Sequence, residues 1–262
     1  MNEFEILKAN ALVDAVMNDG RQAFADINVS ATAIELPEDI ELDEYQYYIQ
    51  RVGFYLTHTL TWCKQLDLAL EFMSNFDYSK RINSSRADHL IYNIENYFMR
   101  LNSVYDRVLQ IVNAVFHLCI NEENVSHGVV VSNYKVQHRP NIINKIKAIQ
   151  KFLQDYAQTR HTLIHKHSWL DLGLRKIELF YLNDLTKSQE NDEWRKVLKY
   201  HRANYLREYL ASKKGEFAKI NKDLALLLDD LFTSLLEEYE IQKRKVKAGN
   251  LINAQTQTPA ES

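Results

Sequence analysis

The segment RHTLIHKH, residues 160–167, gathers one arginine and three histidines within eight positions. An imidazole titrates near neutral pH and can accept or donate a proton, whereas a guanidinium keeps its positive charge. Arg160, His161, His165 and His167 could therefore act together on a phosphate, bind a metal ion, or form a hydrated helix end. Which of these three possibilities applies depends on the secondary structure that positions the segment.

Long helices are predicted on both sides of this segment. Six glycines and three prolines among 262 residues leave few places where a helix would break. Apolar residues recur at alternating steps of four and three from Leu90 to Leu118 and again from Ile142 to Leu163, which is typical of helices buried along one stripe. The predicted helices span 3–27, 43–76, 85–119, about 140 to 165, 174–185, 190–212 and 216–243. The fold class predicted is all-α, an antiparallel bundle of four or more long helices with additional C-terminal helices.

Two segments depart from this helical pattern. Residues 120–141 interrupt it, and GVVVS within them is predicted as a short strand or a loop. Residues 246–262 lose the apolar periodicity and are predicted to be a disordered tail. We expect residues 1–245 to form a single helical domain.

Arg160 occupies a position in the apolar stripe of the helix that begins near Pro140. Burial of a guanidinium without a partner is unfavourable. Its charged end could reach solvent, could pair with Glu95 or Glu71, or could face an anion-binding cleft. Arg160 and His165 are about 140° apart on a regular helix, so they converge only if the arginine arches over or the helix loosens at its end.

RHTLIH, with Arg160 followed by a polar residue, three further residues and His165, resembles the signature of the HEPN superfamily of helical nucleotide-binding domains. The resemblance covers roughly residues 43–170, leaving the helices of 174–243 as additions. It implies a metal-independent endoribonuclease without a cofactor, acting as a homodimer whose two signatures face each other across a cleft. His165 would then be the general acid or base, Arg160 would bind the scissile phosphate, and His161 would orient or assist.

The reaction implied by the resemblance uses the 2′-hydroxyl of RNA as the nucleophile and leaves a 2′,3′-cyclic phosphate. Lys166, His167, Glu95 and Asn96 are candidates for substrate binding. The resemblance also implies RNA as a partner, a role as a toxin or phage-defence effector, and an antitoxin protein as a second partner. Some family members bind or dimerise without catalysis, so a non-catalytic RNA-binding, nucleotide-binding or dimerisation module is the alternative.

A metal site is a second alternative. His161 and His165 share a helix face at a spacing that suits metal ligands. The glutamate of an HExxH motif is absent, because Thr162 follows His161, and the sequence contains no Glu-x-x-His pair. No Gly-rich phosphate loop and no GxSxG motif is present either, which disfavours nucleotide-driven phosphoryl transfer and a serine hydrolase.

The charge distribution favours a local anion-binding surface. The whole chain has a formal net charge of −3, which disfavours a general nucleic-acid binder, but residues 135–176 contain nine basic and two acidic residues. Cys63 and Cys119 lie within apolar patterns and are predicted to be buried. With no secretory segment at the N-terminus and no run of 18 apolar residues, we expect a cytoplasmic protein without a membrane span.

Overall fold

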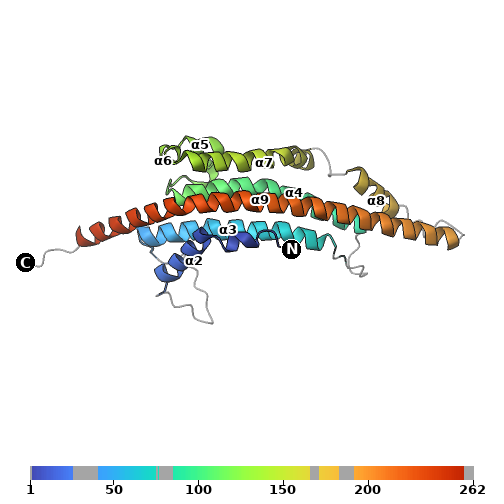
Figure 1. Cartoon of the computed structure of the whole chain (residues 1–262), viewed down its shortest axis with the longest axis horizontal. Coiled ribbons are helices and arrows are strands. Elements are labelled where there is room, and N and C mark those ends of the chain that lie inside the picture. The colour runs from blue at the N-terminus through green and yellow to red at the C-terminus, as the bar shows by residue number, and fades with distance from the viewer. Residues whose placement is uncertain are drawn as a thin grey trace, which may run out of the picture. The chain divides into compact units, whose positions relative to one another are not determined.

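The computed structural model describes residues 2–25, 41–74, 76, 85–165, 171–182 and 192–256; for 158–165, 182, 192 and 250–256 it describes the backbone alone. Every regular element in these ranges is a helix, which confirms the all-α class. No helix within them is both long and apolar enough to cross a membrane. The helices are α1 (Glu5–Lys8), α2 (Ala11–Ala23), α3 (Glu44–Phe72), α4 (Arg86–Val115), α5 (His127–Ser132), α6 (Tyr134–Gln137), α7 (Pro140–His165), α8 (Leu172–Leu182) and α9 (Asp192–Thr256), with a 3-10 turn at Glu122–Asn124 (Figure 1).

The predicted apolar stripes are the core-facing sides of α4 and α7. Ser85 begins α4 as a reciprocal cap, because its backbone N–H donates to Asp88 at 2.8 Å and its hydroxyl accepts from the Asp88 N–H at 3.1 Å. The stripe positions of α4 are all buried: Leu90, Ile94, Tyr97, Leu101, Val104, Val108, Ile111 and Val115. In α7, Ile142, Ile146, Ile149 and Leu153 are buried in the same way. Burial of one continuous face is what stabilises helices of this length.

The described chain divides into two compact units. Unit 1 comprises Met1–Phe4, Trp62–Ser103 and Lys151–Leu224, and unit 2 comprises Glu5–Thr61, Val104–Gln150 and Ala225–Ser262. The helices α3, α4, α7 and α9 therefore each contribute residues to both units. The signature segment, at the end of α7, belongs to unit 1.

Unit 1 is held together by packing and by a buried polar network. Its core contains Cys63, Leu66, Met73, Leu90, Ile94, Tyr97, Phe98, Leu101, Leu153, Leu174, Ile177, Phe217, Ile220 and Leu224. Asn221 in α9 donates to Asp67 in α3 at 2.9 Å, and Lys214 donates to Ser74 at 3.0 Å. As the chain proceeds from Asp67 in α3 to Ser74, two residues past its end, the partners in α9 recede from 221 to 214, so these two helices are antiparallel. The antiparallel part of the fold prediction is therefore confirmed for this pair.

Unit 2 packs α2, α3, α4, α7 and α9 around a second core. Tyr48 of α3 donates to the Val115 carbonyl at 2.9 Å and stacks on Tyr239 of α9. Asn10 caps α2, accepting from the Leu12 N–H at 3.0 Å, and donates to Asp229 of α9 at 2.8 Å. The core contains Leu7, Leu12, Val16, Ile49, Val52, Leu56, Val108, Val112, Phe116, Val130, Val136, Ile142, Ile146, Leu228, Leu231, Phe232 and Leu235.

Three local predictions were wrong. GVVVS forms neither strand nor loop but α5, because Ser126 caps it and Val130 is buried. The helix expected over 3–27 is interrupted before Asn10, whose side chain starts α2. The break expected between 212 and 216 is absent, since α9 (Asp192–Thr256) includes Gly215. The disorder expected for residues 246–262 stays a prediction.

Candidate functional site

The signature occupies the last turns of α7, which remains helical through His165. Positions 160 and 165 are therefore about 140° apart around the axis and about 7.5 Å apart along it. The helix does not loosen between them, so convergence within one chain requires the long arginine to arch over. The side chains of Arg160, His161 and His165 lie outside the described residues, as do Lys166 and His167 entirely.

The contact of α7 with α4 fixes where position 160 lies along the bundle. The ring of Tyr156 lies 6.4 Å from that of Phe98, and Asn102 donates its side-chain N–H to the Tyr156 carbonyl at 3.3 Å. α4 and α7 run in opposite directions (Figure 1). Position 160 follows Tyr156 by four residues and shares its helix face. One turn onward from this contact, the Arg160 backbone is at the level of the α4 turn that contains Glu95.

Glu95 and Asn96 lie between the buried residues Ile94 and Tyr97, and both are half-buried. Their position is compatible with the predicted pairing of Glu95 with Arg160, which stays a prediction. Burial raises the pKa of Tyr156, beside the α4 contact, with Asp155 and Glu216 acting in the same direction. Tyr156 is therefore a neutral hydrogen-bonding phenol at physiological pH. It packs the end of α7 and does not supply charge.

The signature lies at the C-terminal end of α7. The free backbone groups there are carbonyls, which repel anions, in contrast to the N–H groups of a helix N-terminus. Positive charge for a phosphate must therefore come from side chains. Arg160 and the flanking Lys166 are the residues of the signature segment that carry permanent positive charge.

Three basic residues of the window 135–176 make contacts within unit 2. Arg139 pairs with Glu238 at 3.0 Å and with Glu237 at 3.1 Å. Lys145 pairs with Asp230, and Lys135 donates to the His117 carbonyl at 2.9 Å. These three side chains therefore connect elements of unit 2. Arg175 and Lys176, at the other end of the window, are exposed on α8.

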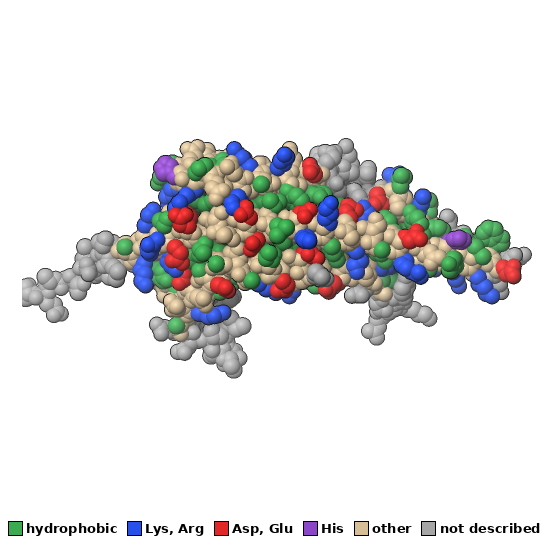
Figure 2. Space-filling view, viewed as in Figure 1, with side chains coloured by type: hydrophobic (Ala, Val, Ile, Leu, Met, Phe, Trp, Pro, Cys, Tyr) green, Lys and Arg blue, Asp and Glu red, His purple; other side chains and the backbone are tan. Residues whose placement is uncertain are grey.

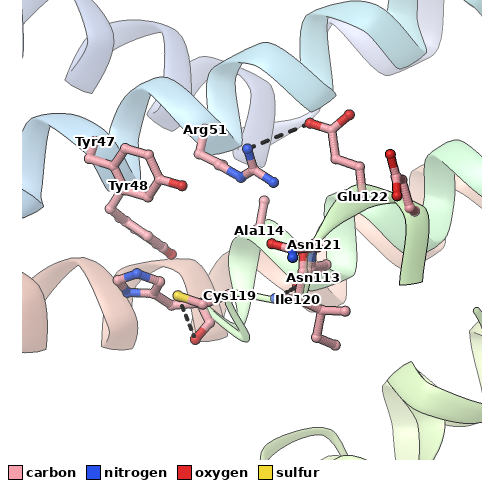
Figure 3. A pocket seen from close by; sticks show the side chains of 11 residues that line it. Tyr47, Tyr48, Arg51, Asn113, Ala114, Cys119, Ile120, Asn121 and Glu122 are labelled. Atoms are coloured by element: carbon pink, nitrogen blue, oxygen red, sulfur yellow. Dashed lines mark hydrogen bonds and ion pairs between the residues drawn. The ribbon is translucent and has the colours of Figure 1, made fainter. Parts of the chain in front are cut away.

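Unit 2 contains a pocket of about 500 Å³ at the end of α4 (Figure 3). His117 and Cys119 have positive φ angles of 48° and 55°, and Asn113 holds the turn by donating to the Ile120 carbonyl at 2.9 Å. A positive φ is a strained conformation for a residue with a β-carbon, and the surrounding contacts must stabilise it. Cys119 is exposed, so its predicted burial was wrong, whereas Cys63 is buried as predicted. The lining residues are Tyr47, Tyr48, Arg51, Asn113, Ala114, His117, Cys119, Ile120, Asn121, Glu122 and Glu123.

The charged groups of this pocket pair with one another. Arg51 lies 3.6 Å from Glu122 (Figure 3), and His117 lies 3.4 Å from Glu44. Burial lowers the pKa of His117, Glu44 partly opposes this effect, and Lys135 adds to it. The imidazole is therefore neutral near pH 7. Sequence reasoning did not find this pocket, because its residues come from two stretches far apart in the chain, 47–51 and 113–123, without a common motif.

A metal centre is not formed by the side chains that the structure describes, where no three potential ligands come together. This finding does not extend to His161, His165 and His167, whose side chains lie outside that set. The metal alternative therefore stays a prediction to be tested.

Comparison with known proteins identifies the family. The model of the Cthe2314-like HEPN family matches residues 41–235. The match begins close to the expected start at 43 and extends beyond the expected end at 170, so α8 and much of α9 lie inside the family region. No curated protein and no solved structure matches the chain. Because the family model covers well over half of the sequence, the chain belongs to the Cthe2314-like HEPN family.

Proposed function

We propose that this HEPN-family chain is a metal-independent endoribonuclease with Arg160 and His165 at its reaction centre. Support comes from the family match over 41–235 together with the signature RHTLIH at the end of α7. The backbone at position 160 lies level with the α4 turn that contains the half-buried Glu95, which is consistent with a pairing of these two residues. A cytoplasmic role as a toxin or phage-defence effector, with an antitoxin protein as partner, belongs to the same proposal.

The chemistry balances without a cofactor. A base removes the proton of the 2′-hydroxyl, the 2′-oxygen forms a bond to phosphorus, and the bond to the 5′-oxygen of the next nucleotide breaks. An acid gives that leaving oxygen a proton, so the products are a 2′,3′-cyclic phosphate and a 5′-hydroxyl. His165 performs one proton transfer, and Arg160 stabilises the charge that develops on the phosphate oxygens. His161 orients these groups, while Lys166, His167, Glu95 and Asn96 contact the substrate.

A homodimer supplies the second catalytic imidazole. Positions 160 and 165 are about 140° apart around the axis of one helix, so a single chain is poorly suited to bring both residues to one phosphate. Two chains related by a two-fold axis would bring two copies of each group to a shared cleft. One His165 would then act as base and the other as acid.

The test compares cleavage of a labelled single-stranded RNA by the wild type, Arg160→Ala and His165→Ala in buffer containing EDTA. We expect rates at least about a hundredfold lower for each variant, because each removes a proton-transfer or charge-stabilising group. His138→Ala and Arg244→Ala are matched controls on exposed positions of unit 2 and should leave the rate unchanged. Circular dichroism verifies that every variant is folded.

The outcomes separate the alternatives. Equal behaviour of the wild type and both variants would remove the enzyme proposal and leave a non-catalytic binding or dimerisation module. Stoichiometric metal in the purified protein, lost together with activity on chelation, would favour a metal site at His161 and His165 instead.

A further inference from the structure

The first part of α9 is a long helical segment without a buried face. Within residues 193–216 every described side chain is exposed or half-buried, and burial begins at Phe217. A helix of this length is normally stabilised by burying one apolar stripe. The segment therefore has the properties of a helix that contacts a partner.

Large apolar and aromatic side chains are exposed on this segment and on α8. Trp194 is 56% exposed and Tyr200 is 65% exposed, and Val197 lies between them at 44%. On α8, Leu172 and Leu179 are 78% and 57% exposed. We call the exposed faces of α8 and of residues 193–214 of α9 the α8–α9 surface. Contiguous exposed apolar groups mark interaction sites more often than single exposed residues do.

The charge of the α8–α9 surface is opposite to that of the chain. Residues 172–182 and 193–214 contain nine lysines and arginines against three glutamates, whereas the chain as a whole has a net charge of −3. Figure 2 shows hydrophobic side chains lying among Lys and Arg side chains over the first part of α9. The basic residues are Arg175, Lys176, Arg195, Lys196, Lys199, Arg202, Arg207, Lys213 and Lys214, of which Lys213 is paired with Asp171 and Glu216.

Two of these cations are held over aromatic rings. The guanidinium carbon of Arg202 lies 4.9 Å from the centre of the Tyr181 ring, and the ammonium of Lys176 lies 5.7 Å from that of Tyr205. Each contact joins α8 to α9 and restricts a side chain that would otherwise be mobile. Cations ordered before binding lose less entropy when they meet an anion.

The combination of exposed rings and ordered cations fits single-stranded nucleic acid. Bases stack on exposed aromatic side chains while lysines and arginines contact the phosphates. A second copy of this surface would instead bring two positively charged faces together. We propose that the α8–α9 surface binds single-stranded RNA that extends from the Arg160–His165 reaction centre. This inference rests on the proposed ribonuclease function, because it takes RNA as the substrate.

Chain connectivity keeps the two regions close. Both belong to unit 1, and Leu172 follows His165 by seven residues. Seven residues span at most about 25 Å when fully extended, so the beginning of α8 lies within that distance of the signature. An RNA strand that continues past the cleaved bond could therefore reach the beginning of α8, and a longer one could continue along α9 towards Tyr200 and Trp194.

Binding is measured by fluorescence anisotropy with a labelled single-stranded RNA in EDTA, in the His165→Ala background so that the RNA is not cut. We expect Trp194→Ala and Tyr200→Ala each to weaken binding about tenfold through loss of stacking, and Trp194→Phe to retain most of the affinity. Tyr134→Ala is the matched control, because Tyr134 is also a tyrosine, is 67% exposed and lies on α6 in unit 2. It should bind RNA as the parent does.

The salt dependence of RNA affinity tests the contribution of the lysines and arginines of the α8–α9 surface. Lys199→Ala should lower the slope of log affinity against log salt by about 0.7, the value for one phosphate contact in a single strand. In the cleavage-competent protein, Trp194→Ala with Tyr200→Ala should raise KM and leave kcat unchanged, because stacking remote from the cleaved bond binds ground state and transition state equally.

The outcomes distinguish this inference from the proposed function. If the wild type cleaves RNA and the Trp194 and Tyr200 variants bind as tightly as the parent, the surface assignment is wrong and the enzyme stands. If cleavage is absent but these variants lose RNA affinity, the enzyme proposal falls and the surface stands. Equal loss in Tyr134→Ala, or a dimer that dissociates in Trp194→Ala without a change in RNA affinity, would also overturn the assignment.

Discussion

Gly173 of α8 lies against the ring of Tyr209 in α9 so closely that a β-carbon at position 173 would stand 2.7 Å from two ring carbons. The Tyr209 hydroxyl donates to Asp171 at 3.2 Å, and Lys213 pairs with the same carboxylate at 3.2 Å. The ring is thus anchored at its far end and cannot easily move. α8 can approach α9 at this point because residue 173 has no side chain.

Gly173→Ala is therefore expected to destabilise the packing of α8 on α9 by about 1–3 kcal/mol, the usual cost of overpacking. Urea unfolding measures the change. Gly215→Ala is the matched control, because a β-carbon at that helical position meets nothing within 4 Å. It should stabilise the protein by about 0.5–1 kcal/mol through helix propensity. Equal effects of the two substitutions would contradict the close contact.

The network of Tyr97, Asn221 and Asp67 supplies a second prediction. The Tyr97 hydroxyl donates to Asn221 at 2.9 Å, and Asn221 donates to Asp67 at 2.9 Å. Tyr97→Phe leaves the Asn221 carbonyl oxygen buried without this donor, so we expect a loss of about 1–3 kcal/mol in the free energy of unfolding. Tyr92→Phe, at a site 69% exposed on the same helix, should change it by less than about 0.5 kcal/mol.

Acid sensitivity follows from two partly buried histidines. Burial lowers the pKa of His117 and of His89 below their ordinary value of 6.5, and Arg86 lowers that of His89 further. Below about pH 6.5 the unfolded chain then binds more protons than the folded one, so stability falls as pH falls from 7 towards 5. His117→Gln and His89→Gln should each reduce this loss.

Unfolding midpoints in urea at pH 7.5, 6.5 and 5.5 measure this effect. The difference in unfolding midpoint between each variant and the wild type at each pH removes the contribution of other titrating groups. His138→Gln, at an exposed position, serves as the control and should keep the pH profile of the wild type. Unchanged profiles in His117→Gln and His89→Gln would show that neither imidazole is kept neutral by the fold.

Mixing of inactive variants tests the shared cleft. If each reaction centre uses groups from two chains, then Arg160→Ala and His165→Ala, each inactive alone, form a mixed dimer that retains one arginine and one histidine. We expect the co-expressed pair to cleave about tenfold faster than either variant alone but more slowly than the wild type, because one of the two proton transfers then lacks its imidazole. Differently tagged chains verify that mixed dimers form. Mixed dimers no more active than either variant would contradict a cleft in which one arginine and one histidine from different chains act together.

The helical class and the course of α4 and α7 could be predicted, because a helix buried on one side has apolar residues that recur about every 3.6 positions. The alternation from Leu90 onward corresponds to buried positions through Val115, where α4 ends. Leu118, the last predicted member, falls beyond the turn at His117, where the backbone adopts a positive φ. Apolar spacing gives the face of a helix more reliably than its last residue.

Local signals failed where tertiary packing outweighs them. The break expected between 212 and 216 includes Gly215, but one glycine costs a helix only about 1 kcal/mol, and burial of Phe217 and Ile220 exceeds that. Val129 and its neighbours have low helix propensity, yet capping and burial of Val130 make α5 helical. The valines alone carry no information about those contacts.

For the candidate site, sequence could identify the signature and its place at a helix end. It could not show that Arg139 and Lys145 would pair with Glu237, Glu238 and Asp230, which lie far along the chain, or that Lys135 would donate to the His117 carbonyl. Nor could it show that Trp194 and Tyr200 of α9 would be exposed. Both findings make α8 and the first part of α9 a better candidate for an RNA-binding surface than the residues 135–145.

The exposure of Cys119 gives the protein a natural attachment point for a spin label. Its only other cysteine, Cys63, is buried, so a thiol reagent under native conditions should modify one position per chain. The turn after α4 restricts that position, which narrows the spread of label orientations. In an assembly of two chains the labels form one pair, and a single interspin distance would then report how two copies are arranged in solution.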